Sequence, residues 1–385
     1  MILILINIPV AFTLLIISCI YILLNDLPLV VVSHILTSST DSFILTAIPL
    51  FILAANFMQR GDITDRIIAF CKDLVGHLSG GLAHVNVLAS MIFSGMSGSA
   101  LADAGGLGIV EVQMMRDGGY DDEFTAAITA ASSTIGPIVP PSIPLILYGA
   151  LARESIGKLF LGGAIPGILV GVGLMIQAYI LAKKRNYPVS PRAGFKQVVY
   201  HCGKVFFPML TPVIILGGIA IGYFTPTEAA AVAAIYAFIL GKFVYRVMTW
   251  TDVLKALLDT AILTGVVVFI MAMAGLWSWM ITNEEIAKMA VDFLTSVSEN
   301  PYIMLFMLNI ILLGLGMFIE PLAIMIMVIP VLLPILHAYH ISTLHYGVVM
   351  TLALMIGLIT PPFGECLFLL SAITGIPVSR VAKAT

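Results

Sequence analysis

The chain of 385 residues is too apolar and too poor in charge for a soluble protein of its length. Hydrophobic residues make up 60% of it, Asp, Glu, Lys and Arg together make up 10%, and the formal net charge is −3. Soluble proteins cover their surface with far more charge than this. The composition therefore excludes a soluble enzyme or binding module, and lipid must solvate the chain.

Long segments without Asp, Glu, Lys or Arg recur along the chain, and a bilayer crossing needs about 20 such residues as a helix. These segments are 1–25, 74–102, 124–152, 159–182, 205–227, 260–283, 300–319 and 321–364. Strands of membrane barrels show short alternating patterns instead. We therefore predict an all-α polytopic membrane protein. The run 1–24 lacks the basic start and the cleavage site of a signal peptide, and it predicts a first membrane helix.

A basic segment near the middle of the chain sets the expected orientation. Residues 183–204 contain no acidic residue, and their basic residues are Lys183, Lys184, Arg185, Arg192, Lys196 and Lys204. By the positive-inside rule this linker is cytoplasmic. It separates residues 1–182 from residues 205–385.

The two parts share a pattern at an offset of 221 residues. Gly95-Met96 falls on Gly316-Met317, Leu101-Ala102 on Leu322-Ala323, Ile135-Gly136 on Ile356-Gly357, and Pro140-Pro141 on Pro361-Pro362. One offset that serves separate places predicts two repeats, 1–182 and 205–385. Many membrane transporters are built from inverted repeats. If the second repeat starts after a cytoplasmic linker, inversion places the N-terminus in the periplasm.

Each predicted repeat contains a re-entrant helical hairpin followed by a broken membrane helix. The hairpins are expected at about 81–117 and 302–337, and the broken helices at about 122–151 and 344–373. The Pro-Pro pairs remove amide donors and disfavour helix before them. Carbonyls left without partners are costly in lipid, but they can serve as ligands around a cation.

Small and polar residues occupy the hairpin tips, and two carboxylates, Asp103 and Glu320, lie beside them in apolar surroundings. Small residues alone are also typical of close helix packing, but their recurrence at the fixed offset favours a functional site. Carboxylates inside a membrane are usually functional. Each one either ligates a cation or orients its hairpin tip. Glu365 is a weaker candidate, and Glu228 fits a helix-capping role.

Neither hairpin tip and neither broken helix contains Arg or Lys. An anionic substrate would therefore find its positive partners in amides, hydroxyls and bound cations. Sodium suits sites made only of oxygen atoms, whereas proton coupling would require Asp103 or Glu320 to titrate. No other metal and no organic cofactor is expected.

Several motifs resemble the large membrane subunit of tripartite ATP-independent periplasmic (TRAP) transporters over nearly the whole chain. The matching segments are Phe93 to Asp103, Ala131 to Ile143, Ser155 to Gly163, Thr225 to Ala229, Gly316 to Glu320 and Thr360 to Pro362. The resemblance implies a sodium-coupled carboxylate importer of the bacterial inner membrane that works by an elevator mechanism. It also implies a small four-helix membrane subunit and a periplasmic solute-binding protein as partners, with lipid around the chain and no nucleic acid.

The resemblance also implies particular site residues. Those for sodium are Ser97, Gly98, Ser99, Gly136, Ile138, Pro140, Gly316, Ile319, Glu320, Thr360 and Pro361. Those for the substrate are Ser99, Asp103, Ser132, Ser133, Thr134, Glu320 and Gly364. Compared with the family, the first helix starts a few residues late and the chain ends before the usual last membrane helix.

Other interpretations remain open at this point. A stand-alone ion-coupled anion transporter needs no binding protein, and a structural subunit transports nothing. An intramembrane enzyme is disfavoured because no HExxH, GxGD-type or GxSxG motif occurs. His337, His340 and His345 could bind a metal, but no carboxylate or thiolate accompanies them, and a membrane-surface helix explains them better.

Overall fold

The computed structural model describes residues 8–41, 43–61 and 63–385, and within these ranges all regular structure is helical. The prediction of an all-α protein is therefore confirmed. The expected first helix over 1–24 corresponds to α2 (Val10–Leu24), and residues 1–7 lie outside the described part of the chain.

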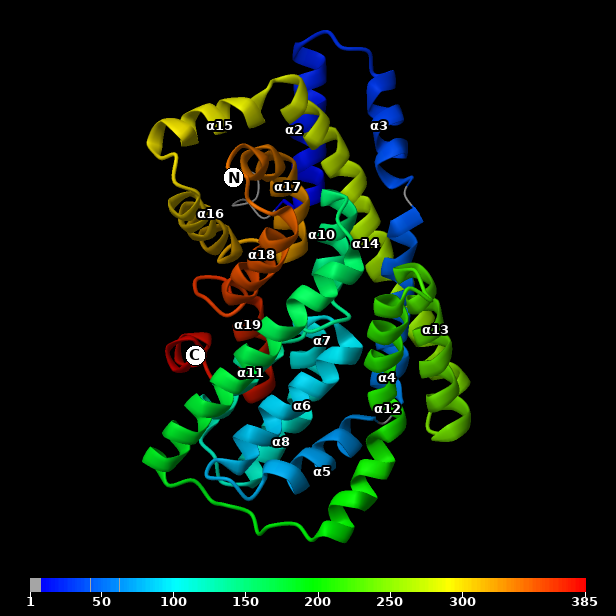
Figure 1. The fold of residues 1–385 in the computed structure, drawn as a ribbon, viewed down its shortest axis with the longest axis vertical. Helices are drawn as coiled ribbons and strands as arrows, with labels where there is room; N and C mark the ends of the chain where they lie inside the picture. Colours follow the sequence, from blue (N-terminus) through cyan, green and yellow to red (C-terminus); the bar gives the residue numbers. More distant parts are fainter. Residues whose placement is uncertain (1–7, 42, 62) are drawn as a thin grey trace.

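One layer of the molecule consists of long helices and the segments that pack against them (Figure 1). Helix α14 contacts α2, α3 and α4, and α13 contacts both α4 and α12. Besides α2, the elements are α3 (Val30–Thr40), η1 (Phe43–Thr46), α4 (Ala47–Arg60), α12 (Phe195–Ile221), α13 (Pro226–Ile239), the π-helical η3 (Leu240–Val244) and α14 (Trp250–Asn283). Helix α15 (Ile286–Val297) follows α14 and, as Figure 1 shows, leads away from this layer to pack against α17 (Pro321–Ala338).

The remaining helices form a second group that packs against this layer. In the first half they are α5 (Ile63–Val75), α6 (Gly81–Ser97), α7 (Ala100–Ala102), the π-helical η2 (Asp103–Leu107), α8 (Gly108–Asp117), α9 (Asp122–Ser133), α10 (Ile143–Ala152) and α11 (Ile156–Arg185). In the second half they are α16 (Pro301–Gly316), α17 (Pro321–Ala338), α18 (Thr343–Gly357), α19 (Glu365–Thr374) and α20 (Val378–Ala384).

Local sequence signals explain where these helices start and stop. Ser99, Ser142, Glu320 and Ser342 each cap a helix by accepting a backbone N–H with the side chain. Proline occupies the first turn of α10, α16 and α17, where a missing N–H costs nothing. The helical structure is interrupted between α9 and α10 and between α18 and α19, and a Pro-Pro pair lies in each interruption.

Helix bounds in the two halves follow the offset seen in the sequence. Ala100, the start of α7, corresponds to Pro321, the start of α17, and Asp122, the start of α9, corresponds to Thr343, the start of α18. Asp117 and Ala338, the last residues of α8 and α17, differ by the same 221 positions. The order of helix, tip, helix and break is thus the same in both halves.

Within the described residues, five helices are long and apolar enough to cross a membrane, or six if the pair α19 and α20 is counted as one broken span. They include α11, α12 and α14, whose outward faces carry exposed Leu, Ile, Val and Phe side chains. Such faces suit lipid. The helices of the two tips and breaks are mostly shorter, and the largest core cluster contains residues of both halves.

Candidate functional site

A cavity of about 120 Å³ lies where the two hairpin tips meet. Both tips, both breaks and the helices α4 and α14 of the long-helix layer contribute to its wall. The lining residues are Ile52, Gly98, Ser99, Ala100, Leu101, Pro137, Ile143, Pro144, Leu263, Val267, Glu320, Pro321, Leu322, Met355, Leu358 and Glu365. Residues far apart in the sequence thus form one small, mainly apolar chamber.

The cavity is acidic. Its only ionisable lining residues are Glu320 and Glu365, and none of the lining residues is Lys, Arg or His. Two carboxylates around one small chamber repel each other and any anionic ligand unless a cation or a proton offsets their charge. The electrostatics of the chamber therefore favour a bound cation or the protonation of a carboxylate.

The first tip is held tightly against the first break. Gly98 has φ +62°, and its carbonyl accepts a hydrogen bond from Ile143 N at 3.4 Å. A Cβ atom at Gly98 would lie 2.5 Å from the carbonyl oxygen of Pro141, so only glycine fits. Ser99 Oγ accepts a hydrogen bond from Ala102 N at 3.4 Å and starts α7. The tip backbone thus reaches the cavity beside the break.

Asp103 links the same hairpin to the middle of the break. Its side chain is buried and accepts a hydrogen bond from Ser97 Oγ. Its other oxygen, Oδ2, has no protein partner, and a Cβ atom at Gly136 would lie 2.5 Å from it. A buried carboxylate oxygen without a partner is costly. Asp103 Oδ2 is therefore positioned to accept a cation or a proton beside Gly136.

The second tip repeats this arrangement with different residues. Glu320 caps α17 by accepting a hydrogen bond from Ala323 N at 3.0 Å, and its side chain lines the cavity. Phe363 N in the second break donates to Met317 O in the tip at 3.1 Å. A Cβ atom at Gly357 would lie 2.8 Å from the backbone of Gly316. Hairpin and break are again in backbone contact.

Of the residues predicted for sodium or substrate, the structure brings Gly98, Ser99 and Glu320 together around the cavity. The three hydroxyls at the end of α9 point elsewhere. Ser132 Oγ donates to Asn86 Oδ1 at 2.7 Å, Ser133 Oγ to Ala130 O at 2.8 Å, and Thr134 Oγ1 to Ala131 O at 2.7 Å. These hydroxyls stabilise the interior of the first half in this conformation.

The remaining predicted residues flank the cavity without lining it. Gly136, Ile138 and Pro140 are buried in the first break, and Gly316, Ile319 and Gly364 are buried in the second half. Thr360 is half-buried and donates to Ile356 O at 2.6 Å, and Pro361 is exposed. The two breaks therefore differ in their surroundings, although their sequences correspond.

A buried polar network that sequence reasoning missed lies behind the first break. Asn86 Nδ2 donates to Thr129 Oγ1 at 2.8 Å, and Ser90 Oγ contacts both Ser132 Oγ at 3.1 Å and Glu111 Oε1 at 3.5 Å. Glu111 is only 1% exposed. The available signal in the sequence was Glu111, a carboxylate within the predicted hairpin.

In the described residues no group of three His, Cys, Asp or Glu side chains could hold a metal, and His340 and His345 line a separate open cavity.

The fold is that of a multi-pass helical membrane protein with a cavity between two hairpin tips, an arrangement that suits a permease. A family model described as "Tripartite ATP-independent periplasmic transporter, DctM component" matches residues 1–385. The chain belongs to this family, the large permease components of TRAP transporters. This confirms the resemblance seen in the sequence and places the protein among transporters, not enzymes.

Similar proteins include two named permeases. The sialic acid TRAP transporter large permease protein SiaM of Vibrio cholerae is 43% identical over 376 residues, which cover 97% of this chain and 88% of that protein. The C4-dicarboxylate TRAP transporter large permease protein DctM of Pseudomonas aeruginosa is 40% identical over 349 residues, which cover 91% of this chain and 82% of that protein. The solved YdaH transporter of Alcanivorax borkumensis has the same fold, with a TM-score of 0.64 at 15% identity, over 92% of this chain and 82% of that one.

Proposed function

We propose that this permease couples the import of a carboxylate to sodium ions across the bacterial inner membrane. The acidic cavity between the two hairpin tips supports the proposal, because an anion can enter it only if cations or protons offset the two carboxylates, and sodium suits the oxygen atoms around the tips. Relatives named for sialic acid and for C4-dicarboxylates suggest a small organic acid as the substrate.

Oxygen atoms around the tips suit sodium. The first ion would be held by the tip Ser97 to Ser99 and the break from Gly136 to Pro140, and the second by Gly316 to Glu320 with Thr360 and Pro361. Carbonyls released by the breaks supply neutral ligands. Ser99 and Glu320 line the cavity and would approach the substrate directly. Asp103, Ser132, Ser133, Thr134 and Gly364 are buried and would have to reorient to reach it.

Movement of the two-hairpin group against the long-helix layer would expose the cavity alternately to the two sides of the membrane. This elevator motion is supported by the position of the cavity, whose wall includes Ile52 of α4 and Leu263 and Val267 of α14. A small membrane subunit would hold that layer still, and a periplasmic binding protein would deliver the substrate. Both partners are proposed from the family relationship.

Uptake into proteoliposomes tests the proposal. We expect accumulation of radiolabelled sialic acid or succinate when an inward sodium gradient, the small subunit and the binding protein are all present. Replacement of sodium by potassium should abolish accumulation, because sodium is the proposed coupling ion and the lining residues include no lysine or arginine that could take its place. Equal uptake in potassium would refute sodium coupling, and equal uptake without the binding protein would favour a stand-alone transporter.

Labelling of a native cysteine tests the proposed orientation. Cys202 is exposed in the first turns of α12, within the basic segment 183–204, whereas Cys71 and Cys366 are buried. In a Cys19→Ser background, a membrane-impermeant maleimide should modify Cys202 in inside-out vesicles and leave it unmodified in intact spheroplasts. The reverse pattern would place residues 183–204 in the periplasm and overturn the orientation.

A further inference from the structure

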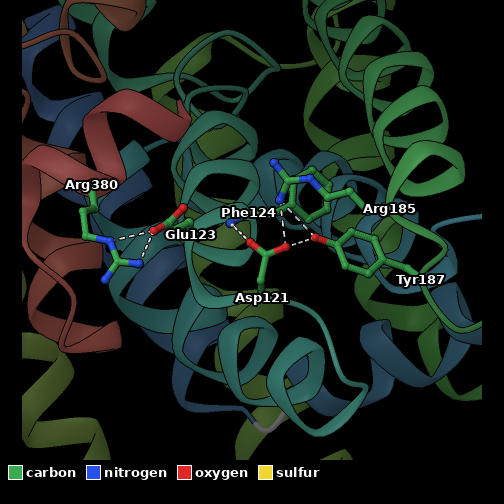
Figure 2. A network of polar contacts seen from close by, with 6 residues as sticks. All are labelled: Asp121, Glu123, Phe124, Arg185, Tyr187 and Arg380. Atoms are coloured by element: carbon green, nitrogen blue, oxygen red, sulfur yellow. Dashed lines mark hydrogen bonds and ion pairs between the residues drawn. The ribbon is translucent and has the colours of Figure 1, made fainter.

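Three consecutive acidic residues lie at the start of α9, and each is paired with an arginine from a different element. Figure 2 shows the pairs of Asp121 and Glu123. The pairs are Asp121–Arg185 at 2.7 Å, Asp122–Arg116 at 2.6 Å and Glu123–Arg380 at 2.6 Å. We call this group the arginine clamp. Its position at the start of α9 matters because α9 leads directly into the first break.

The arginines of the clamp come from both halves of the chain. Arg116 ends the first hairpin in α8, Arg185 ends α11, and Arg380 lies in α20 of the second half. Arg116 also donates a hydrogen bond to the carbonyl of Thr374, the last residue of α19. The first turn of α9 is thereby tied to the helix that leaves the second break.

Each group in the clamp lies where helix electrostatics favour it. The three acidic side chains lie at the N-terminus of α9, where the helix dipole favours negative charge. Arg185 lies at the C-terminus of α11, and Arg116 binds the C-terminal carbonyl of α19, that of Thr374; both positions favour positive charge. Partial burial would raise the pKa of Asp121, but hydrogen bonds from Tyr187, from Phe124 N at 2.9 Å and from Arg185 outweigh it and hold that pKa below its ordinary value. Asp121 is therefore charged at neutral pH.

A second set of contacts connects the two broken helices, at the end of α10 and the start of α18. Thr343 starts α18; its hydroxyl donates to Glu154, and its carbonyl accepts from Tyr148 Oη at 2.6 Å. Thr343 corresponds to Asp122 at the offset of 221 residues. The end of α10 therefore meets the start of α18, as the end of α19 meets the start of α9.

Between these two sets of contacts the broken helices pack against each other. Ser133 Oγ in α9 lies 3.8 Å from Cys366 Sγ in α19, and both residues are buried. Val381 of α20 is fully buried as well. The mutual contacts of α9, α19 and α20 indicate that these helices move as one body.

We propose that the arginine clamp is a positioning device: it aligns the second hairpin and break with the first, and it stays closed throughout transport. The proposal rests on the proposed function of the cavity. Exposed ion pairs contribute little to stability, and the Arg380 and Glu123 side chains are 60% and 41% exposed. Their value lies in geometry, since Arg380 approaches Glu123 Oε1 with two nitrogens, which fixes its orientation.

Charge reversal and exchange test the positioning role. Glu123→Arg and Arg380→Glu should each raise the KM for sodium-driven uptake of the transported acid, sialic acid or succinate, about fivefold, as expected for a coupling residue. The double exchange Glu123→Arg with Arg380→Glu should restore the KM. Lys288→Glu, which breaks the exposed Lys288–Glu285 pair in α15, is the matched control and should leave it unchanged.

Unchanged KM in both single variants, or no rescue by the exchange, would overturn the positioning role. If a reversal lowers the amount of protein in the membrane, Arg380→Gln replaces it and should raise the KM without added repulsion. A wild-type chain that shows no sodium-driven uptake would instead contradict the proposed function.

Crosslinking tests whether the clamp stays closed. Cysteines replace Glu123 and Arg380 in a chain that carries Cys19→Ser and Cys202→Ser, and a short thiol-reactive crosslinker joins them. We expect uptake to persist after crosslinking, because both positions belong to one moving body. Loss of uptake on crosslinking, reversed by reduction of a cleavable crosslinker, would show that the clamp opens and would overturn the proposal.

Discussion

Replacement of Glu320 by alanine should reduce sodium-driven uptake by roughly 100-fold, the loss expected when a binding site is displaced by about 1 Å. Glu320 has two roles in the structure: it lines the cavity, and it caps α17 through Ala323 N at 3.0 Å. Alanine removes both the carboxylate that faces the chamber and the acceptor that orients the second tip. Initial uptake rates in proteoliposomes with equal amounts of protein measure the effect.

Glu228→Ala is the matched control for this experiment. Glu228 also caps a helix, α13, through a reciprocal pair with Thr225, but it is exposed and remote from the cavity. Its replacement should leave uptake near that of the wild type. Normal uptake in Glu320→Ala would contradict our assignment of the second tip. Glu320→Gln separates the two roles, because glutamine keeps an acceptor for the cap and loses the charge.

Replacement of Gly98 by alanine should reduce uptake by more than about tenfold, because the first tip can no longer rest against the break. A left-handed backbone costs a residue with a Cβ atom about 1–2 kcal/mol, and at Gly98 that atom would also lie 2.5 Å from Pro141 O. The tip must move away from the break, and the Ile143 N to Gly98 O hydrogen bond is lost. Uptake at several sodium concentrations should show a weaker apparent sodium affinity.

Gly222→Ala shares the backbone strain of this change without the clash. Gly222 has φ +85°, and no heavy atom lies within 4 Å of a Cβ atom built there. The variant should lose some thermal stability and keep normal transport. If Gly98→Ala and Gly222→Ala reduce uptake equally, general destabilisation explains both, and the contact between tip and break has no special role.

The sequence allows the positions of the breaks and tips to be predicted because their causes are local. Proline and glycine act on the backbone wherever they occur, so Pro140-Pro141 and Pro361-Pro362 mark the ends of helix without any knowledge of tertiary structure. Capping by Ser99 and Glu320 is equally local. Repetition of these signals at one offset indicated which of them belong together.

Contacts between distant segments could not be predicted in this way. The side chain of Ser132 turns toward Asn86, 46 residues earlier in the chain, and the rotation of a helix just before a break has no sequence signature. Glu111 is buried by a network that no single segment reveals. The pairing of Glu123 with Arg380 depends on the turn between α19 and α20, whose axes differ by 115°.

The shared wall of the cavity has a consequence for the origin of the chain. Gly98 and Ser99 come from one half, and Glu320 and Glu365 from the other, so a protein that consisted of one half would enclose no chamber. A half-length ancestor could have formed a chamber only as a pair of subunits. The contacts of Thr343 with the end of α10, and of Thr374 with Arg116, would then be the remains of an ancient dimer interface, preserved inside a single polypeptide.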